Sequence, residues 1–424
     1  MHGLFAALCL PALLSQAVAP QPGTARPAGT EPSVGAKVAD RAFAELQKKA
    51  YAVALPLYVQ ALAPTPNQAQ LWNEYGICLR NLHRYPAAVR AGWRAIQLDA
   101  GHTTQPWTAQ ANTFMEVREW GAAQACLEKL EALHKDKAFV AKAWLNLAFR
   151  MLAVKETAGV VAHCRRATQL DAGNALAWID LAQALACSGG DAKETLACLA
   201  KGQALAERQK DVQQADYAGQ LAMKLKAGEA IWPEPVTGRS WQLIPANLLS
   251  LPEQDASQVS LPATVEHRYT LEGNDILAMS LPETWTESFD PARAEHLFTV
   301  RYAVVGQEGF KAFFSPIKVG NPKGVKVTAD DVAKRLLPGS VEKELTPQVM
   351  ATPDLLGYWL LSTDKKSDGK ELPKGAYRHL ATFLLDVGRI QCVATVLTNS
   401  KAPEVIDPCV KAFGSARKLQ TATH

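Results

Sequence analysis

The chain has 424 residues, of which 48% are hydrophobic and 20% are charged. This length and composition are ordinary for globular protein and predict about two domains. Basic residues number 45 and acidic residues 41, and the two signs are interspersed along the chain, so the net charge is only +4. A basic stripe of the kind that binds nucleic acid is therefore not expected, and nucleic acid is excluded as the predicted partner.

The N-terminus predicts export. Residues 1–19, MHGLFAALCLPALLSQAVA, are apolar and end in the small residues Ala17-Val18-Ala19, as a secretory signal peptide does. The pattern is atypical because no Lys or Arg precedes the apolar run and Pro20 would follow the cut. Cleavage after Ala17, or an apolar tail on a cytosolic protein, are the alternatives. We expect a periplasmic or extracellular protein.

The next segment predicts a tether. Residues 20–35 are rich in Pro, Gly and Thr and have no periodic apolar face, which is typical of a flexible connection. After the signal, no stretch of eighteen or more uncharged apolar residues occurs. We therefore expect no stable membrane insertion once the signal is cleaved.

A stretch from residue 70 to residue 100 predicts two short helices packed back to back. Apolar and small residues fall at helical spacing on one face of each helix, and a break separates the two. Small residues let the helices approach closely, and a Trp fills the space that is left. These residues are Trp72, Tyr75, Gly76 and Leu79 in the first helix and Ala88, Gly92 and Ala95 in the second.

The same block recurs along the chain. Trp107 lies 35 residues after Trp72, Trp144 lies 37 residues further on, and Trp178 another 34. A copy without Trp precedes the first block, and the segments QLDA at 97–100 and 169–172 are identical. The pattern resembles the tetratricopeptide repeat (TPR), with consensus W-x2-L-G-x2-Y…A-x3-F…A…P. The first block departs from it with Tyr75, Leu79, Gly92 and Ala100 at the Leu, Tyr, Phe and Pro positions.

The resemblance implies an α-solenoid over residues 36–228. Five helix pairs exceed the three that stacked repeats need to bury a continuous core. A lone last helix over 211–227, ended by Gly228, is expected to cap the stack. The alternative is an unrelated helical bundle with regular Trp spacing.

The resemblance also names a binding surface for a protein or peptide. In a TPR array the first helix of each pair lines a concave groove, where amide side chains can bond an extended peptide and apolar residues form a pocket. Alternatively, these residues face solvent or pack on the linker or the C-terminal domain. The candidates are Asn73, Ile77, Arg80, Asn112, Met115, Lys142, Leu145, Asn146, Phe149, Ile179 and Gln183.

One special form of this groove is not expected. Asn112 and Asn146 stand at the two Asn positions of the carboxylate clamp known from some TPR co-chaperones. The cation positions of that clamp hold Thr108, Leu176 and Asp180 instead. Two neutral residues and an acid at these positions do not favour a terminal carboxylate.

The solenoid is followed by a linker and a second domain. Residues 229–262 carry five Pro together with Trp232 and Trp241, which predicts an irregular linker packed on one or both domains. From residue 263 to residue 424 the pattern alternates, as in strands. It predicts an α+β sandwich with a mainly antiparallel sheet. The expected strands are 269–271, 276–281, 297–304, 311–319, 357–362, 377–386 and 391–397, with helices over 328–337 and from Pro403 to about Lys418.

Parts of this domain resemble the PsbP-like fold, whose members act mostly as interaction or assembly modules. The resemblance rests on Leu281-Pro282-Glu283-Thr284-Trp285, the strand 297–304, the pair YRHLATFLLDVGRIQCVATVLT and a terminal helix ending near Ser415-Ala416-Arg417. An α+β domain of another kind is the alternative. The PsbP-like family supplies no catalytic residues to transfer to this chain.

The sequence offers no chemistry of its own. It has no phosphate-binding glycine motif, no nucleophile elbow and no Cys/His cluster with metal spacing, so we predict no catalytic residues, no metal and no cofactor. Cys392 and Cys409 are either a disulfide, if the chain is exported, or buried thiols. We therefore expect a non-catalytic scaffold that binds a protein or peptide. The alternative is a small-ligand-binding or enzymatic C-terminal domain with the repeats as a regulatory or dimerising arm.

Overall fold

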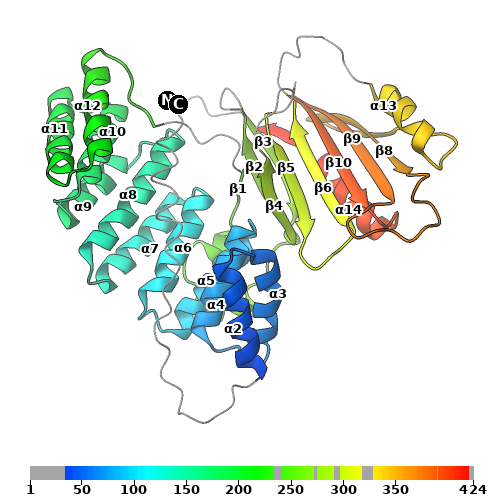
Figure 1. The fold of residues 1–424 in the computed structure, drawn as a ribbon, viewed down its shortest axis with the longest axis horizontal. Helices are drawn as coiled ribbons and strands as arrows, with labels where there is room; N and C mark the ends of the chain where they lie inside the picture. The colour runs from blue at the N-terminus through cyan, green and yellow to red at the C-terminus, as the bar shows by residue number, and fades with distance from the viewer. Residues whose placement is uncertain are drawn as a thin grey trace.

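The structure is a computed structural model that describes residues 34–233, 240–271, 275–290, 297–317, 328–388 and 390–419 (Figure 1). The predicted signal peptide and nearly all of the predicted tether lie outside these residues. Two lobes are visible in Figure 1, a curved array of helices and a domain built on β-sheets.

The helical lobe is the predicted TPR-type solenoid. Residues 34–226 form five antiparallel helix pairs and a last single helix, in which neighbouring helices pack side by side. The first helices are α2 (Val34–Gln47), α4 (Ala69–Asn81), α6 (Thr104–Glu116), α8 (Lys137–Ala153) and α10 (Ala175–Cys187). The second helices are α3 (Tyr51–Leu62), α5 (Tyr85–Leu98), α7 (Trp120–Leu133), α9 (Val160–Leu170) and α11 (Ala192–Arg208), and α12 (Val212–Lys226) caps the stack.

The repeat is visible in the backbone as well as in the Trp spacing. In every turn inside a helix pair, the second residue after the first helix has a left-handed backbone, with φ between 59° and 71°. This conformation lets the chain leave the first helix and reverse within a few residues. The residues are Lys49, His83, Arg118, Lys155 and Gly189, and their spacing repeats that of the Trp residues.

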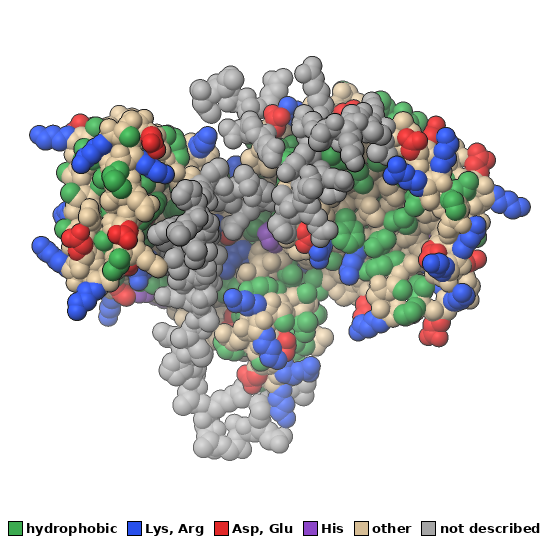
Figure 2. All heavy atoms as spheres, turned by 45° about the horizontal axis from the view of Figure 1, so that its top comes forward, with side chains coloured by type: hydrophobic (Ala, Val, Ile, Leu, Met, Phe, Trp, Pro, Cys, Tyr) green, Lys and Arg blue, Asp and Glu red, His purple; other side chains and the backbone are tan. Residues whose placement is uncertain are grey.

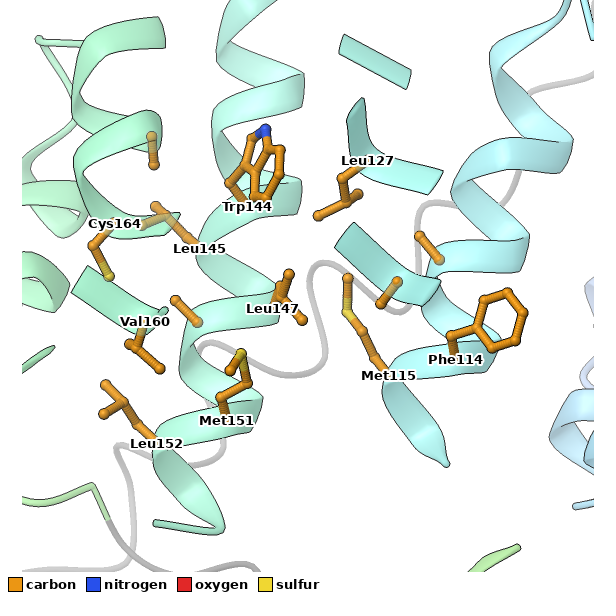
Figure 3. Close-up of a cluster of buried hydrophobic side chains, with 14 of the residues drawn as sticks. Phe114, Met115, Leu127, Trp144, Leu145, Leu147, Met151, Leu152, Val160 and Cys164 are labelled. Carbon is orange, nitrogen blue, oxygen red and sulfur yellow. The ribbon is translucent and has the colours of Figure 1, made fainter. Parts of the chain in front are cut away.

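Two helix layers of unequal spacing give the solenoid its curvature. The first helices pack closely on one another, α2 on α4, α4 on α6, α6 on α8 and α8 on α10. In the described chain, consecutive second helices show no comparable packing. Close packing on one side and wide spacing on the other place α4, α6, α8 and α10 on the inner, concave face. Apolar side chains fill the space between the layers (Figure 3).

The second lobe contains two antiparallel sheets. The smaller sheet has the order β1-β2-β3-β11 and the larger β4-β5-β6-β10-β9-β8-β7. The smaller sheet consists of β1 (Ser240–Gln242), β2 (Thr264–Thr270), β3 (Ile276–Pro282) and β11 (Arg417–Leu419). The larger consists of β4 (Trp285–Asp290), β5 (Thr299–Val304), β6 (Phe310–Pro316), β7 (Gln348–Thr352), β8 (Leu355–Thr363), β9 (His379–Val387) and β10 (Ile390–Thr398).

Two helices complete this α+β domain. Helix α14 (Pro403–Gly414) packs its buried Phe413 on Phe314 and Phe383 of the larger sheet, with ring centroids 6.2 and 5.0 Å away. Helix α13 (Ala329–Leu336) begins with a capping box between Thr328 and Asp331, which satisfies the first backbone N–H groups. It lies at the outer side of the larger sheet (Figure 1).

Some details differ from the sequence-based expectation. The predicted strands are present with shifted ends, but β1, β4, β7 and β11 were not predicted. The last helix ends at Gly414 and not near Lys418, because residues 417–419 pair with β3 as β11. This segment is only three residues long, too short for alternation to reveal it.

The candidate disulfide is not formed. Cys392 on β10 and Cys409 on α14 are both free thiols, and both are buried in the core of the sheet domain. The Cys409 Sγ donates to the Val405 carbonyl at 3.2 Å. Burial raises the pKa of both thiols, that of Cys409 to about 12. The second alternative, buried thiols, therefore describes this pair.

A matched pair of glycines tests the close packing of the helix layers. A Cβ at Gly202 on α11 would lie 2.8 Å from the Ile179 Cγ1 and 3.1 Å from the Ala175 carbonyl, whereas a Cβ at Gly219 on α12 would meet nothing within 4 Å. We expect Gly202→Ala to lower the free energy of unfolding by about 1–3 kcal/mol. Gly219→Ala should leave it unchanged or raise it by up to about 1 kcal/mol. Chemical denaturation measures both, and equal effects would contradict the packing.

Candidate functional site

Charged side chains from three first helices meet on the inner face of the solenoid. Arg150 of α8 forms an ion pair with Glu116 of α6, with 3.0 Å between Nη1 and Oε1. Arg80 of α4 reaches the Ala109 carbonyl of α6 at 3.5 Å. Burial lowers the pKa of Arg80; the nearby Glu116 opposes this shift and Arg150 adds to it. The guanidinium groups of Arg80 and Arg150 therefore both interact electrostatically with the Glu116 carboxylate.

A row of amides lies beside this cluster. The Asn146 Oδ1 accepts from Arg150 Nε at 3.1 Å, and its Nδ2 donates to the Asn112 Oδ1 at 3.3 Å. The same Nδ2 lies 3.5 Å from the Met115 Sδ. The two Asn residues that the sequence places in adjacent repeats are thus in contact. Arg80, Asn112, Met115, Asn146, Glu116 and Arg150 together are called the inner cluster below.

The inner cluster contains an unused donor. Arg150 is 8% exposed, and its Nη2 has no hydrogen-bond partner among the described residues. On the same face, the buried Asn73 of α4 has an Oδ1 without a partner in that part of the chain. A buried polar group left without a bond costs about 1–3 kcal/mol. Such groups indicate places where a ligand or water completes the site.

The far end of the groove is occupied by the chain itself. After α12 the chain reverses, and the Gln183 Nε2 of α10 donates to the Ile231 carbonyl at 3.0 Å. Both residues are only 3% exposed, and Ile231 joins the apolar core of the solenoid. Trp232 packs half-buried on the same core. Residues 229–233 are called the strap below, because they cover the concave face at α10.

The predicted groove residues divide into two groups. Half-buried or exposed, and available to a partner, are Ile77, Arg80, Asn112, Lys142, Asn146 and Phe149. Buried are Asn73, Met115, Leu145, Ile179 and Gln183. The group that stays accessible lies on α4, α6 and α8. This part of the inner face, from α4 to α8, is called the open half of the groove.

Two of the candidates are wrong as groove-lining residues. Ile179 is fully buried because it packs against Gly202 of the second helix α11. Leu145 is 3% exposed and belongs to the same core. Figure 3 shows it on the side of α8 that faces Cys164 of α9. The apolar pocket that the sequence assigned to Leu145, Phe149 and Ile179 therefore reduces to Phe149.

Asp180, another acidic residue on the inner helices, has a raised pKa. Asp180 of α10 is 7% exposed, and burial raises its pKa from 3.8 to about 7. It occupies one of the cation positions of the clamp discussed above. A carboxyl group in this environment is partly protonated at neutral pH and gives the strap end of the groove little fixed negative charge.

The sheet domain is seated on the turns between first and second helices. The Arg84 Nη2 forms an ion pair of 2.7 Å with Glu283, and both side chains are largely buried. Gln242 of β1 donates to the His83 carbonyl and accepts from the Tyr85 backbone N–H at 3.2 Å. The next turn contributes a similar contact. The turns that reverse the chain after α4 and after α6 thus also hold the second domain.

Arg118 makes that second contact. Its guanidinium lies 3.6 Å from the ring centroid of Trp241 of β1, and its Nη2 donates to the Thr270 Oγ1 at 3.1 Å. Burial lowers the pKa of Arg118 to about 10. A stacked, desolvated guanidinium is a stronger contact than an exposed one.

A buried carboxylate lies directly behind this junction. Glu287 of β4 accepts hydrogen bonds from Tyr269 at 2.8 Å and from Ser240 and His267, while its backbone N–H reaches the Leu82 carbonyl of the α4–α5 turn at 3.4 Å. Burial alone would raise the pKa of Glu287, but His267 and the other partners outweigh it and lower that pKa to about 2. The ionised group is therefore fully satisfied, as a buried charge requires.

The linker wraps around helix α5 between β1 and β2. Trp93 donates to the Leu248 carbonyl at 2.8 Å, and the Gln97 amide bonds the Pro252 carbonyl and the Ala256 N–H at 2.9 and 2.8 Å. Leu248 is fully buried. The linker therefore packs on the domains as expected, but it is not irregular throughout, because residues 240–242 pair with β2 as strand β1. It runs along the outer face of the solenoid, away from the open half of the groove.

Sequence reasoning missed the junction and Arg150 of the inner cluster. Arg150 carries no signal of its own, because it lies beyond the positions that the TPR pattern assigns to the groove. The junction joins residues about 120–200 positions apart in the chain, and no local pattern reports such a pairing. The one usable signal was Trp241, a large aromatic residue in a Pro-rich segment.

The sheet domain offers a shallow hollow and an apolar edge. The hollow, about 390 Å³, lies between the β7–β8 and β9–β10 turns and is lined by Thr352, Pro353, Asp354, Leu355, Leu356, Asp386, Gly388 and Lys418. Val349 on the edge strand β7 is 65% exposed and Leu356 on β8 is 53% exposed. In the described ranges no cluster of His, Cys, Asp or Glu has metal-binding geometry.

Charges are mixed on the surface. On the face drawn in Figure 2, Lys and Arg are scattered among Asp and Glu over both lobes. Among the helices that the structure describes, none is long and apolar enough to cross a membrane.

Neither a family model nor a curated protein matches the sequence. Several solved structures are similar to it at low identity. YrrB, described as a TPR protein with an unusual peptide-binding site, is 15% identical over 43% of this chain and 90% of its own, with a TM-score of 0.34. MamA from Desulfovibrio magneticus RS-1 is 15% identical over 48% and 100%, with a TM-score of 0.32. PilF from Pseudomonas aeruginosa is 15% identical over 46% and 93%, with a TM-score of 0.31. The assignment to TPR-type solenoids rests on the repeat geometry of this chain.

A double-mutant cycle tests the junction. We expect Arg84→Ala and Glu283→Ala to show a coupling free energy of about 1–3 kcal/mol in equilibrium unfolding, because each side chain is largely desolvated by the other domain. The exposed pair Arg165–Glu194 within the solenoid, with side chains 51% and 43% exposed, is the control and should couple by less than about 0.5 kcal/mol. Equal couplings for the two pairs would contradict a buried junction.

The protonation of Asp180 gives a pH dependence of stability. Its pKa in the folded state lies above the unfolded value of 3.8, so ionisation is disfavoured by folding, and stability falls as the pH rises from about 4 to about 7. Asp180→Asn removes this penalty and should stabilise the protein by about 1–3 kcal/mol at pH 8. Thermal unfolding at pH 5 and pH 8 measures the difference. A variant whose gain is equal at both pH values would contradict it.

Proposed function

We propose that this protein is a non-catalytic scaffold that binds an extended segment of a partner protein in the open half of the groove. The observation that carries the proposal is the inner cluster, where amide and guanidinium groups of three consecutive repeats lie side by side on the concave face. Extended peptides are recognised by donors and acceptors spaced along such a surface, with an apolar pocket for a side chain.

The strap supports this mode of recognition. The Gln183 amide holds an extended backbone through the Ile231 carbonyl, and an apolar side chain enters the core beside it. Asn146 presents the same chemistry one repeat away, and Asn112 two repeats away. The Asn112 Nδ2 is not engaged by any hydrogen bond in the described chain, and Phe149 supplies the apolar contact. The strap fills one half of the groove and leaves the other half to a partner.

The sheet domain then supplies a second docking surface. Its seat on the turns at His83 and Arg118 places it next to the C-terminal ends of α4 and α6, where the inner cluster lies. The exposed Val349 and Leu356 on the β7–β8 hairpin are the apolar groups that favour docking of a protein over binding of a small molecule. The alternative, a ligand-binding or enzymatic domain, would use the hollow beside Asp354 and Asp386.

We further propose export to the cell envelope, supported by the apolar N-terminus and its Ala17-Val18-Ala19 ending. Fractionation of cells that express the chain with and without residues 1–19 tests this. We expect a shortened, exported product from the full chain and retention of the truncated one. Retention of both in the cytosol would contradict export.

Site-specific photo-crosslinking tests the groove. A photoreactive residue in place of Asn112 should link a partner segment, whereas the same residue in place of Lys129, exposed on the second helix α7, should not. The control lies in the same repeat but on the outer face, and it is more exposed than Asn112, so poor access cannot explain a missing adduct there. Mass spectrometry of the adduct identifies the partner sequence. Equal yields at the two positions, or adducts at Lys129 alone, would contradict recognition in the groove.

A further inference from the structure

We propose that the open half of the groove selects a carboxylate, so that the partner segment carries an acidic group that docks between Arg80 and Arg150. The inference rests on the proposed function and specifies which chemical group of the bound segment the groove recognises. It concerns charged residues at the C-terminal ends of α4 and α8 and not the positions 108, 176 and 180, which hold no cation.

The charges on this part of the inner face do not balance. Burial is the main reason that the pKa of Arg80 is lowered; the nearby Glu116 opposes this shift and Arg150 adds to it, so both guanidinium groups lie close to one carboxylate. Glu116 bonds Arg150 through Nη1 and leaves Nη2 without an acceptor. The guanidinium of Arg118, in the turn after α6, lies outside the inner cluster and is already covered by Trp241. An added anion would balance the second positive charge of the Arg80 and Arg150 pair.

The free hydrogen-bonding groups of the inner cluster fit a ligand that accepts hydrogen bonds and not one that donates them. Arg150 Nε is held by the Asn146 Oδ1, which fixes the plane of the guanidinium. Its Nη2 is buried and has no partner among the described residues, and Asn112, whose Nδ2 is a donor, is linked to the same guanidinium through Asn146. A ligand that meets these groups must offer oxygen lone pairs, because guanidinium and amide nitrogens only donate. A carboxylate accepts two such bonds at once, and these bonds are stronger than neutral ones.

The surroundings favour a peptide over a free acid. Phe149 is half-buried and lies three residues after Asn146, on the same face of α8, so an apolar side chain of the segment has a contact beside the amide row. Asn112 and Asn146 continue the row toward the backbone of an extended segment. The carboxylate has two sources, an Asp or Glu side chain or a chain terminus, and both have the same chemistry.

Selection from random peptides tests the proposal. The full chain is presented with two libraries of short peptides, one ending in a free carboxylate and one in a carboxamide. We expect binders from both libraries to share an Asp or Glu, and replacement of that acid by its amide to weaken binding about tenfold. The Arg150→Gln and Arg80→Gln variants should lose this preference. Arg165→Gln removes one exposed positive charge from α9 and is the matched control, which should keep it.

Each outcome decides the matter. Enrichment of acids only at the free C-terminus supports the carboxylate and assigns it to the chain end. Binders without acids, still lost on substitution of Asn112, overturn the acid preference and leave the groove as the binding site. The absence of any binder overturns both proposals. Thermal unfolding of each variant shows that a lost preference does not come from an unfolded solenoid.

Discussion

The turn between α4 and α5 is the constraint on which the rest of the structure depends. Its left-handed residue His83 reverses the chain within one helix pair, and the same turn exposes backbone groups that receive Gln242 and Glu287 of the sheet domain. A shift of this turn would break both the repeat and the junction. The two lobes are therefore one unit whose relative position is fixed by buried polar contacts, which tolerate little displacement.

This arrangement determines which surface of the solenoid stays accessible to a partner. The strap closes the groove at α10, the linker covers the outer face at α5, and the sheet domain occupies the turns beside α4 and α6. The accessible polar groups that remain on the inner face lie on α4, α6 and α8. Donor groups predominate there, because Arg80 and the two Asn amides lie beside the buried Arg150, and Glu116 is the carboxylate of the inner cluster.

The sequence predicts the parts of this molecule that depend on local pattern. Trp at regular intervals identifies the helix pairs, and Thr328 with Asp331 identifies the start of α13. The sequence does not predict the contacts that join segments distant in the chain. Ile179 stands at a groove position of the repeat pattern. Its side chain is nevertheless in the core, because Gly202 has no side chain and Ile179 packs directly against it. Arg150 and the His83–Gln242 contact have no local signature, because their roles arise only when three repeats and a second domain come together.

The measurement that tests the account most directly is amide hydrogen exchange of the full chain with and without a bound partner segment. Binding in the open half of the groove predicts slower exchange in α4, α6 and α8, with unchanged exchange in the second helices α9 and α11 and in the strap. Protection confined to the sheet domain, around the β7–β8 hairpin or the hollow at Asp354, would contradict the account. It would move the binding site from the solenoid to the second domain.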